Sequence, residues 1–299
     1  MIPKDIFAYF QERFPVINMA LFAILFFTVN AVAVYFVSTG TTREIWWMLL
    51  GVVAVISFFF RLRVFDEIKD FDIDMKNHPQ RVLQSGRVKK KHLILISFVG
   101  TIIEIIWSLV SGFPVLICWS IAVGYSLLMR YEFFVGDFLN RHLLLYAITH
   151  MLVMPLIILW VYSGFHPQLD LLFPFYILAG LSLFSGFSFE IARKIYAPEA
   201  EKSSIDSYSN SVGYNGSIIL VLVVLLCGVL IQSYLLHKIN SRTWTYFLIS
   251  FIFLFALFLY LKNIFKPVEK SLRTAEKVVS LFMLASYVSI IIEVHSQNI

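Results

Sequence analysis

Long apolar runs alternate with short polar segments along the whole chain. Nine of these runs reach the roughly twenty residues that a helix needs to cross a membrane. They cover approximately residues 15–38, 44–64, 92–110, 114–131, 142–164, 171–190, 215–236, 244–263 and 277–295. Phe, Leu, Ile and Val are mixed in them without period-two alternation, so the pattern predicts transmembrane helices and not barrel strands. We therefore expect an all-α, polytopic membrane protein with a single transmembrane domain over 1–299.

The composition points to the same class of protein. The chain is 59% hydrophobic and 14% charged, whereas soluble domains are about 25% charged. This balance excludes a soluble domain. Membrane lipid is an expected partner and nucleic acid is not.

The distribution of Lys and Arg predicts the orientation. With a cytoplasmic N-terminus, twenty-one of the 24 basic residues fall on the cytoplasmic side, and only Arg43, Lys238 and Arg242 fall on the other. The odd number of spans then places the C-terminus outside. Two long polar loops, at about 65–91 and 190–212, become cytoplasmic. A bacterial inner or cell membrane is the expected location.

The first of these loops carries an unusual density of acids. Asp66, Asp70 and Asp74 are spaced i, i+4, i+8, so they share one face if the preceding helix continues. Stacked carboxylates repel each other unless a cation lies between them, and Mg²⁺ is the usual cation when a phosphate completes the site. The basic residues around them suit an anionic ligand: Arg61, Arg63, Lys69, Arg81 and Arg87. The alternative is a charged loop that only orients the protein.

The second loop contains another acidic cluster, made of Glu190, Glu199, Glu201 and Asp206. Glu190 ends an apolar helix and should face the interior of the bundle, because a charge facing lipid is costly. Two acidic clusters on one side of the membrane suggest two Mg²⁺ ions with a diphosphate between them. Alternatively, Arg193 and Lys194 neutralise Glu190 in an ion pair.

Both loops match signatures of a known family. The first reads Asp66-Glu67-Ile68-Lys69-Asp70-Phe71-Asp72-Ile73-Asp74, followed by Arg81-Val82-Leu83 and Gly86-Arg87. It resembles the first signature of the UbiA-type intramembrane prenyltransferases. The second loop, with Glu190, Glu199, Glu201, Asp206-Ser207-Tyr208-Ser209 and Gly213, is similar to that family's second signature, and Tyr125-Ser126 followed by Arg130 is a third likeness. Val82 replaces a usual Pro, and Glu replaces Asp in the second signature, which indicates a divergent member.

The resemblance implies a bundle around a central cavity that opens to the cytoplasmic loops. It also implies Mg²⁺-dependent transfer of a prenyl chain from an allylic isoprenyl diphosphate to an acceptor, with release of diphosphate. The acceptor is expected to be aromatic, or otherwise a small or lipid molecule. Catalytic roles fall on Asp66, Asp70, Asp74, Glu190 and Arg81. Metal binding falls on Asp66, Asp70 and Asp74 for one ion and on Glu190 with Glu199 or Glu201 for the other. Substrate binding falls on Arg61, Lys69, Arg130, Arg193, Lys194, Asp206 and Tyr208, the last two beside the acceptor.

Two other functions stay open at this point. One is a terpene cyclase of the same family, which uses no acceptor, and the other is a cation-binding transporter. Prenyl length and oligomeric state are also open. Among other polar residues, Glu104 lies inside a span, where it either serves function or pairs with a neighbouring helix. Glu293 and His295 end the last span and are expected to be solvated.

Overall fold

The computed structural model describes residues 3–37, 43–168, 173–201 and 206–297, so the second polar loop is described except for 202–205. All regular secondary structure within these ranges is helical. In chain order the helices are α1 (Pro3–Arg13), α2 (Val16–Val37), α3 (Ile45–Lys69), α4 (Phe71–Asn77), α5 (Lys90–Ser111), α6 (Phe113–Arg130), the 3₁₀ turn η1 (Glu132–Phe134), α7 (Gly136–Asn140), α8 (Leu143–Met151), α9 (Val153–Phe165), α10 (Phe173–Arg193), α11 (Tyr208–Ser211), α12 (Tyr214–Lys238), α13 (Thr243–Phe265) and α14 (Glu269–Gln297).

The predicted spans are confirmed. Within the described residues, nine helical segments are long and apolar enough to cross a membrane. Two of them extend further than the hydropathy pattern indicates: α3 continues to Lys69, and α14 already starts at Glu269. Hydropathy marks only the part of a helix that contacts lipid, whereas the polar turns of α14 stay helical through pairs such as Arg273 with Glu269.

The fifth span is interrupted. The expected helix over 142–164 is divided into α8 and α9, with Leu152 between them. Pro155 explains the break, because it has no N–H to donate to the carbonyl of Met151 and its ring crowds that carbonyl.

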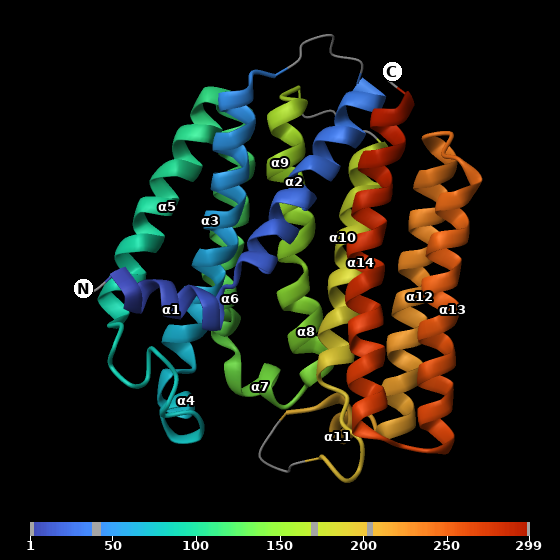
Figure 1. Ribbon diagram of the computed structural model, residues 1–299. Helices are drawn as coiled ribbons and strands as arrows, with labels where there is room; N and C mark the ends of the chain where they lie inside the picture. Colours follow the sequence, from blue (N-terminus) through green and yellow to red (C-terminus); the bar gives the residue numbers. More distant parts are fainter. Residues whose placement is uncertain (1–2, 38–42, 169–172, 202–205, 298–299) are drawn as a thin grey trace. The chain divides into compact units, whose positions relative to one another are not determined.

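The described contacts group the chain into two compact units. The first comprises the described parts of 1–30, 39–130 and 160–169. In it α3 and α5 lie side by side (Figure 1). At their contact a Cβ on Gly100 would lie 2.9 Å from the Cβ of Ser57, which shows how closely the two backbones approach. The single domain over 1–299 stays a prediction.

The second unit comprises the described parts of 31–38, 131–159 and 170–299. Its helices α10, α12, α13 and α14 lie side by side (Figure 1). Inside it, Gln232 of α12 donates from Nε2 to the carbonyl oxygen of Ser286 on α14 at 3.1 Å. Such polar contacts help to fix one helix against another within a membrane.

One expectation about the last span is wrong. Glu293 is fully buried, and its Oε2 accepts a hydrogen bond from the backbone N–H of Arg242 at 3.0 Å. Glu293 therefore supplies a partner to an N–H at the start of α13, which helix geometry leaves without one. His295 is exposed, as expected.

Candidate functional site

The acids of the first loop stay one helical turn apart, although the helix does not run unbroken. α3 ends at Lys69, and Asp70 joins it to α4 with φ −89° and ψ 4°. The i to i+4 hydrogen bonds nevertheless continue: the N–H of Asp70 donates to Asp66 O at 2.8 Å, and that of Asp74 donates to Asp70 O at 2.8 Å. The predicted one-turn spacing of the three residues along the backbone is thus preserved across the junction.

Three arginine side chains contact the acids of this loop. Glu67 is buried, and its Oε1 accepts from Nε of Arg13 at 2.5 Å and from Nη2 of Arg63 at 2.6 Å. Asp74 Oδ2 lies 2.7 Å from Nη1 of Arg81 and 3.7 Å from Nη2 of Arg13. Arg13 therefore links two acids of the loop, a role that sequence analysis missed. Its position at the end of a short polar helix before the first span was the available signal.

Helix α1 contacts the same loop at two further points. Glu12 Oε2 accepts from the backbone N–H of Val82 at 3.0 Å, and Asp5 Oδ1 lies 3.0 Å from Nη2 of Arg87. Tyr9 is fully buried in a core that also contains Phe60. The first loop is thus attached along the length of α1.

The donor set of the first loop fits Mg²⁺. Asp66 is exposed, and Asp70 and Asp74 are half-buried. Mg²⁺ in proteins is usually held by one or two carboxylates, with phosphate oxygens and water completing the octahedron. No group of three or more His, Cys, Asp or Glu side chains in the described chain forms a ready-made metal cage. Asp66, Asp70 and Asp74 are therefore not assembled as a three-carboxylate ligand set within the described residues.

Arg61 and Arg130, two predicted phosphate contacts, lie in the same unit as this loop. Arg61 is buried, with Nη1 2.6 Å from Oε2 of Glu104. Trp119 Nε1 donates to the same oxygen at 2.8 Å. Of the two roles expected for Glu104, the structure shows pairing with a neighbouring helix. Arg61 is its partner inside the span. Arg130 lies with its guanidinium carbon 5.0 Å from the ring centroid of Phe65, next in sequence to Asp66.

In the second loop, Glu190 is already paired. Its Oε2 accepts from Nε of Arg193 at 2.6 Å and lies 2.5 Å from Nη2 of the same residue. Its Oε1 lies 3.1 Å from Nζ of Lys194. The ion-pair alternative is the arrangement present here, so this carboxylate would have to release a cation before it could bind a metal.

The other acids of the second loop support its fold. Glu201 Oε1 accepts from the hydroxyl of Ser207 at 2.6 Å, and Glu199 Oε1 accepts from the backbone N–H of Glu269 at 3.2 Å. Asp206 is exposed. These contacts do not bring Glu199 and Glu201 together with Glu190 as a ligand set within the described residues.

Tyr208 lies in the interior of the second loop. It is fully buried, and its backbone N–H donates to the carbonyl oxygen of Lys194 at 3.0 Å. Burial, with a smaller contribution from the Glu190 carboxylate, raises the pKa of Tyr208 well above its ordinary value. Like any tyrosine hydroxyl at neutral pH, that of Tyr208 is protonated and can donate to an oxygen.

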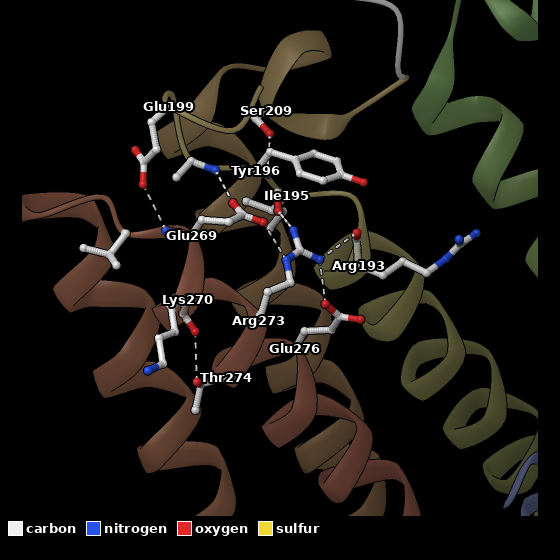
Figure 2. A network of polar contacts seen from close by, with 12 residues as sticks. Arg193, Ile195, Tyr196, Glu199, Ser209, Glu269, Lys270, Arg273, Thr274 and Glu276 are labelled. Atoms are coloured by element: carbon white, nitrogen blue, oxygen red, sulfur yellow. Dashed lines mark hydrogen bonds and ion pairs between the residues drawn. The ribbon is translucent and has the colours of Figure 1, made fainter. Parts of the chain in front are cut away.

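A cation outside both signatures organises the second loop. Figure 2 shows Arg273 of α14 between the carboxylates of Glu269 and Glu276, directed at the chain leaving α10. In the sequence pattern this residue contributes only to the predicted orientation. Its spacing from the two acids, four residues after one and three before the other, was the signal for a helix-surface cluster.

Comparison with known proteins gives consistent results. A family model described as the UbiA prenyltransferase family matches residues 13–285. No curated protein matches the chain. A structure described under digeranylgeranylglyceryl phosphate synthase in membranes has a TM-score of 0.65 and 17% identity, covering 97% of this chain and 99% of that one. The apo structure of a UbiA homolog from Aeropyrum pernix K1 has a TM-score of 0.65 and 14% identity, covering 90% of this chain and 96% of that one. At these identities the two structures show a shared fold.

Proposed function

The chain belongs to the UbiA prenyltransferase family, and on that basis we propose that it transfers a prenyl chain from an allylic isoprenyl diphosphate to an acceptor in the membrane. Diphosphate is the second product. The observation that carries this proposal is the first loop, where Asp66, Asp70 and Asp74 follow one another at single-turn intervals beside Arg81. The family match, over residues 13–285, includes this loop.

In the proposed reaction the first loop binds the diphosphate end of the substrate. Asp66, Asp70 and Asp74 would hold Mg²⁺, which supplies positive charge to stabilise the departing diphosphate. Arg81 lies on the rim of the loop, 23% exposed, and can donate to a phosphate oxygen from its remaining N–H groups. Lys69 is exposed on the last turn of α3 and adds a further cation.

The second loop is proposed to serve the same reaction. Arg193 and Lys194 carry positive charge at the end of α10 and can bind phosphate oxygens. Asp206 and Tyr208 are the proposed acceptor contacts, and the protonated Tyr208 hydroxyl suits an acceptor oxygen. A second metal at Glu190 with Glu199 or Glu201 stays a prediction, because Glu190 is paired with two cations.

The acceptor is proposed to be an aromatic compound or a lipid. The aromatic acceptor follows from the sequence resemblance. The lipid is supported by the structural neighbour, whose name gives a glyceryl phosphate lipid as its product.

Diphosphate release tests the proposal directly. Purified protein is incubated with Mg²⁺ and geranyl, farnesyl or geranylgeranyl diphosphate, with and without aromatic and glyceryl phosphate acceptors. Release that needs both Mg²⁺ and an acceptor supports the transferase. Release without an acceptor, with a cyclic or hydrocarbon product, favours the terpene cyclase. No release by folded protein under any condition contradicts both and favours cation transport.

Individual acids of the first loop give a sharper test. Asp70→Ala and Asp74→Ala should each lower turnover by about 100-fold or more, because each removes charge stabilisation at the reacting phosphate. Asp72→Ala is the matched control. This acid lies exposed between the other two in the same loop, outside the proposed ligand set, and its replacement should leave turnover within about twofold. Equal activity in all three variants would remove the metal-site proposal.

A further inference from the structure

Arg273 makes contacts through every part of its guanidinium. Nη2 donates to the carbonyl oxygen of Ile195 at 2.5 Å, and Nη1 donates to that of Arg193 at 3.1 Å. Nε donates to Oε1 of Glu269 at 2.7 Å, and Nη1 also donates to Oε2 of Glu276 at 2.6 Å. A planar group with five N–H donors in fixed directions can satisfy such a set.

The two carbonyls lie where α10 ends. The last carbonyls of a helix have no partner within it and carry partial negative charge, so a cation is favourable there. Arg193 is the final residue of α10, and Ile195 lies two residues beyond it. Arg273 thus closes the end of a helix from a position 80 residues later in the sequence.

Glu269, one of the two carboxylates that orient Arg273, also holds the loop. Glu269 accepts from Arg273 with one oxygen and from the backbone N–H of Ala197 with the other, at 2.9 Å. Glu199 in turn accepts from the backbone N–H of Glu269 at 3.2 Å. The ring of Tyr196 lies 4.8 Å from the Arg273 guanidinium carbon. Residues 193–199 are therefore attached to the first turns of α14 at several points, as Figure 2 shows.

We propose that Arg273 is a positioning residue for the second acidic loop: it fixes the backbone from which Glu190, Arg193 and Lys194 act, without touching substrate. The proposal rests on the proposed function of that loop. Glu190 and Arg193 lie in the last turn of α10 and Lys194 directly follows it, and the two carbonyls that Arg273 binds lie at this same end of the helix. Displacement of binding groups by about 1 Å can cost about 100-fold in rate.

Lysine cannot replace this arginine. Its ammonium is a single charged point and cannot donate in one plane to two carbonyls and two carboxylates. Arg273→Lys should therefore keep the charge beside Glu269 and Glu276 but release the loop. Arg273→Gln removes both the positive charge and the planar set of N–H donors. Lys270→Gln is the control: Lys270 is exposed one turn earlier on α14, and Figure 2 draws only a backbone contact there, its carbonyl accepting from Thr274.

The first measurement needs neither substrate nor metal. Amide hydrogen exchange of the protein in detergent is compared for Arg273→Lys, Arg273→Gln, Lys270→Gln and the unchanged chain. Peptides over 193–201 should exchange at least about fivefold faster in both Arg273 variants. The middle of α14 should be unchanged, and Lys270→Gln should match the unchanged protein. Unaltered exchange of 193–201 in both Arg273 variants would overturn the proposal, even if the protein proves not to be a prenyltransferase.

The second measurement is the Mg²⁺ dependence of diphosphate release from geranylgeranyl diphosphate. A displaced loop should raise the Mg²⁺ concentration for half-maximal rate several-fold in Arg273→Lys. A role limited to overall folding would lower the active fraction and leave that concentration unchanged, which would also contradict the proposal. If the unchanged protein releases no diphosphate, the proposed function fails, and the exchange result still decides the role of Arg273 in the loop.

Discussion

Gly213 adopts φ 79° and ψ 155°, a region of backbone space that residues with a Cβ almost never enter. It links α11 to α12 directly after the second loop. No heavy atom lies within 4 Å of where its Cβ would stand, so space does not require glycine there. The requirement comes from the backbone alone.

Replacing Gly213 with Ala should therefore lower the unfolding free energy by about 1–3 kcal/mol. Gly124→Ala is the matched control, since Gly124 lies inside α6 with equally open space around it and no positive φ. That replacement should be neutral or should stabilise by about 0.5–1 kcal/mol, because alanine is the better helix former. Thermal unfolding in detergent compares the two. Equal midpoints would mean that the backbone at Gly213 relaxes freely.

At the residue scale, sequence predicted what is local. The spacing of Asp66, Asp70 and Asp74 depends only on helix geometry and is preserved. The partners of the acids were harder to predict because they come from far along the chain. Arg13 is 54 residues from Glu67, and only the folded chain brings them together. Their roles as ligands stay predictions until they are tested.

At the scale of elements, α3 and α5 are joined by a buried ion pair. Arg61 contacts Glu104 at 2.6 Å and Thr101 Oγ1 at 3.1 Å, and its guanidinium carbon lies 4.4 Å from the ring centroid of Phe58. A charge removed from such a pair leaves the other buried without compensation, which is far more costly than losing the pair as a whole.

Glu104→Leu should accordingly destabilise the protein by about 3–5 kcal/mol, and Arg61→Met with Glu104→Leu should recover most of that loss. Thermal unfolding in detergent measures both. Turnover of the double variant then tests the predicted phosphate contact of Arg61. A stable but inactive double variant would support substrate binding by Arg61, and a stable, active one would leave it a structural residue.

For the whole molecule, orientation is the prediction with the widest consequence. In a variant with Cys118 and Cys227 replaced by Ala, single cysteines are introduced at Ser85 in the first loop and at Thr243 at the start of α13. An impermeant maleimide added to intact cells should label Thr243→Cys and not Ser85→Cys, because the basic loops are expected in the cytoplasm. The reverse pattern would place the acidic loops outside the cell and overturn the predicted topology.

The sequence predicted the helical class and the spans because every helix that crosses lipid needs a run of about twenty apolar residues. It could not predict the burial of Glu293, since that depends on the N–H of Arg242 at the start of α13. Pro155 indicated the interruption near Leu152, because proline has no N–H for the helical hydrogen bond. Hydropathy alone does not show that missing bond. The attachment of the first loop to α1 required the fold itself.

The closure of α10 by Arg273 also has a consequence during synthesis. A ribosome that adds about 5–20 residues per second needs roughly 4–16 s to pass from Arg193 to Arg273, 80 residues on. Throughout that interval the nascent second loop lacks the guanidinium that later holds it. The contacts of residues 193–199 with α14 can therefore form only after translation has reached the final helix, and a chain ending before Glu269 would lack them.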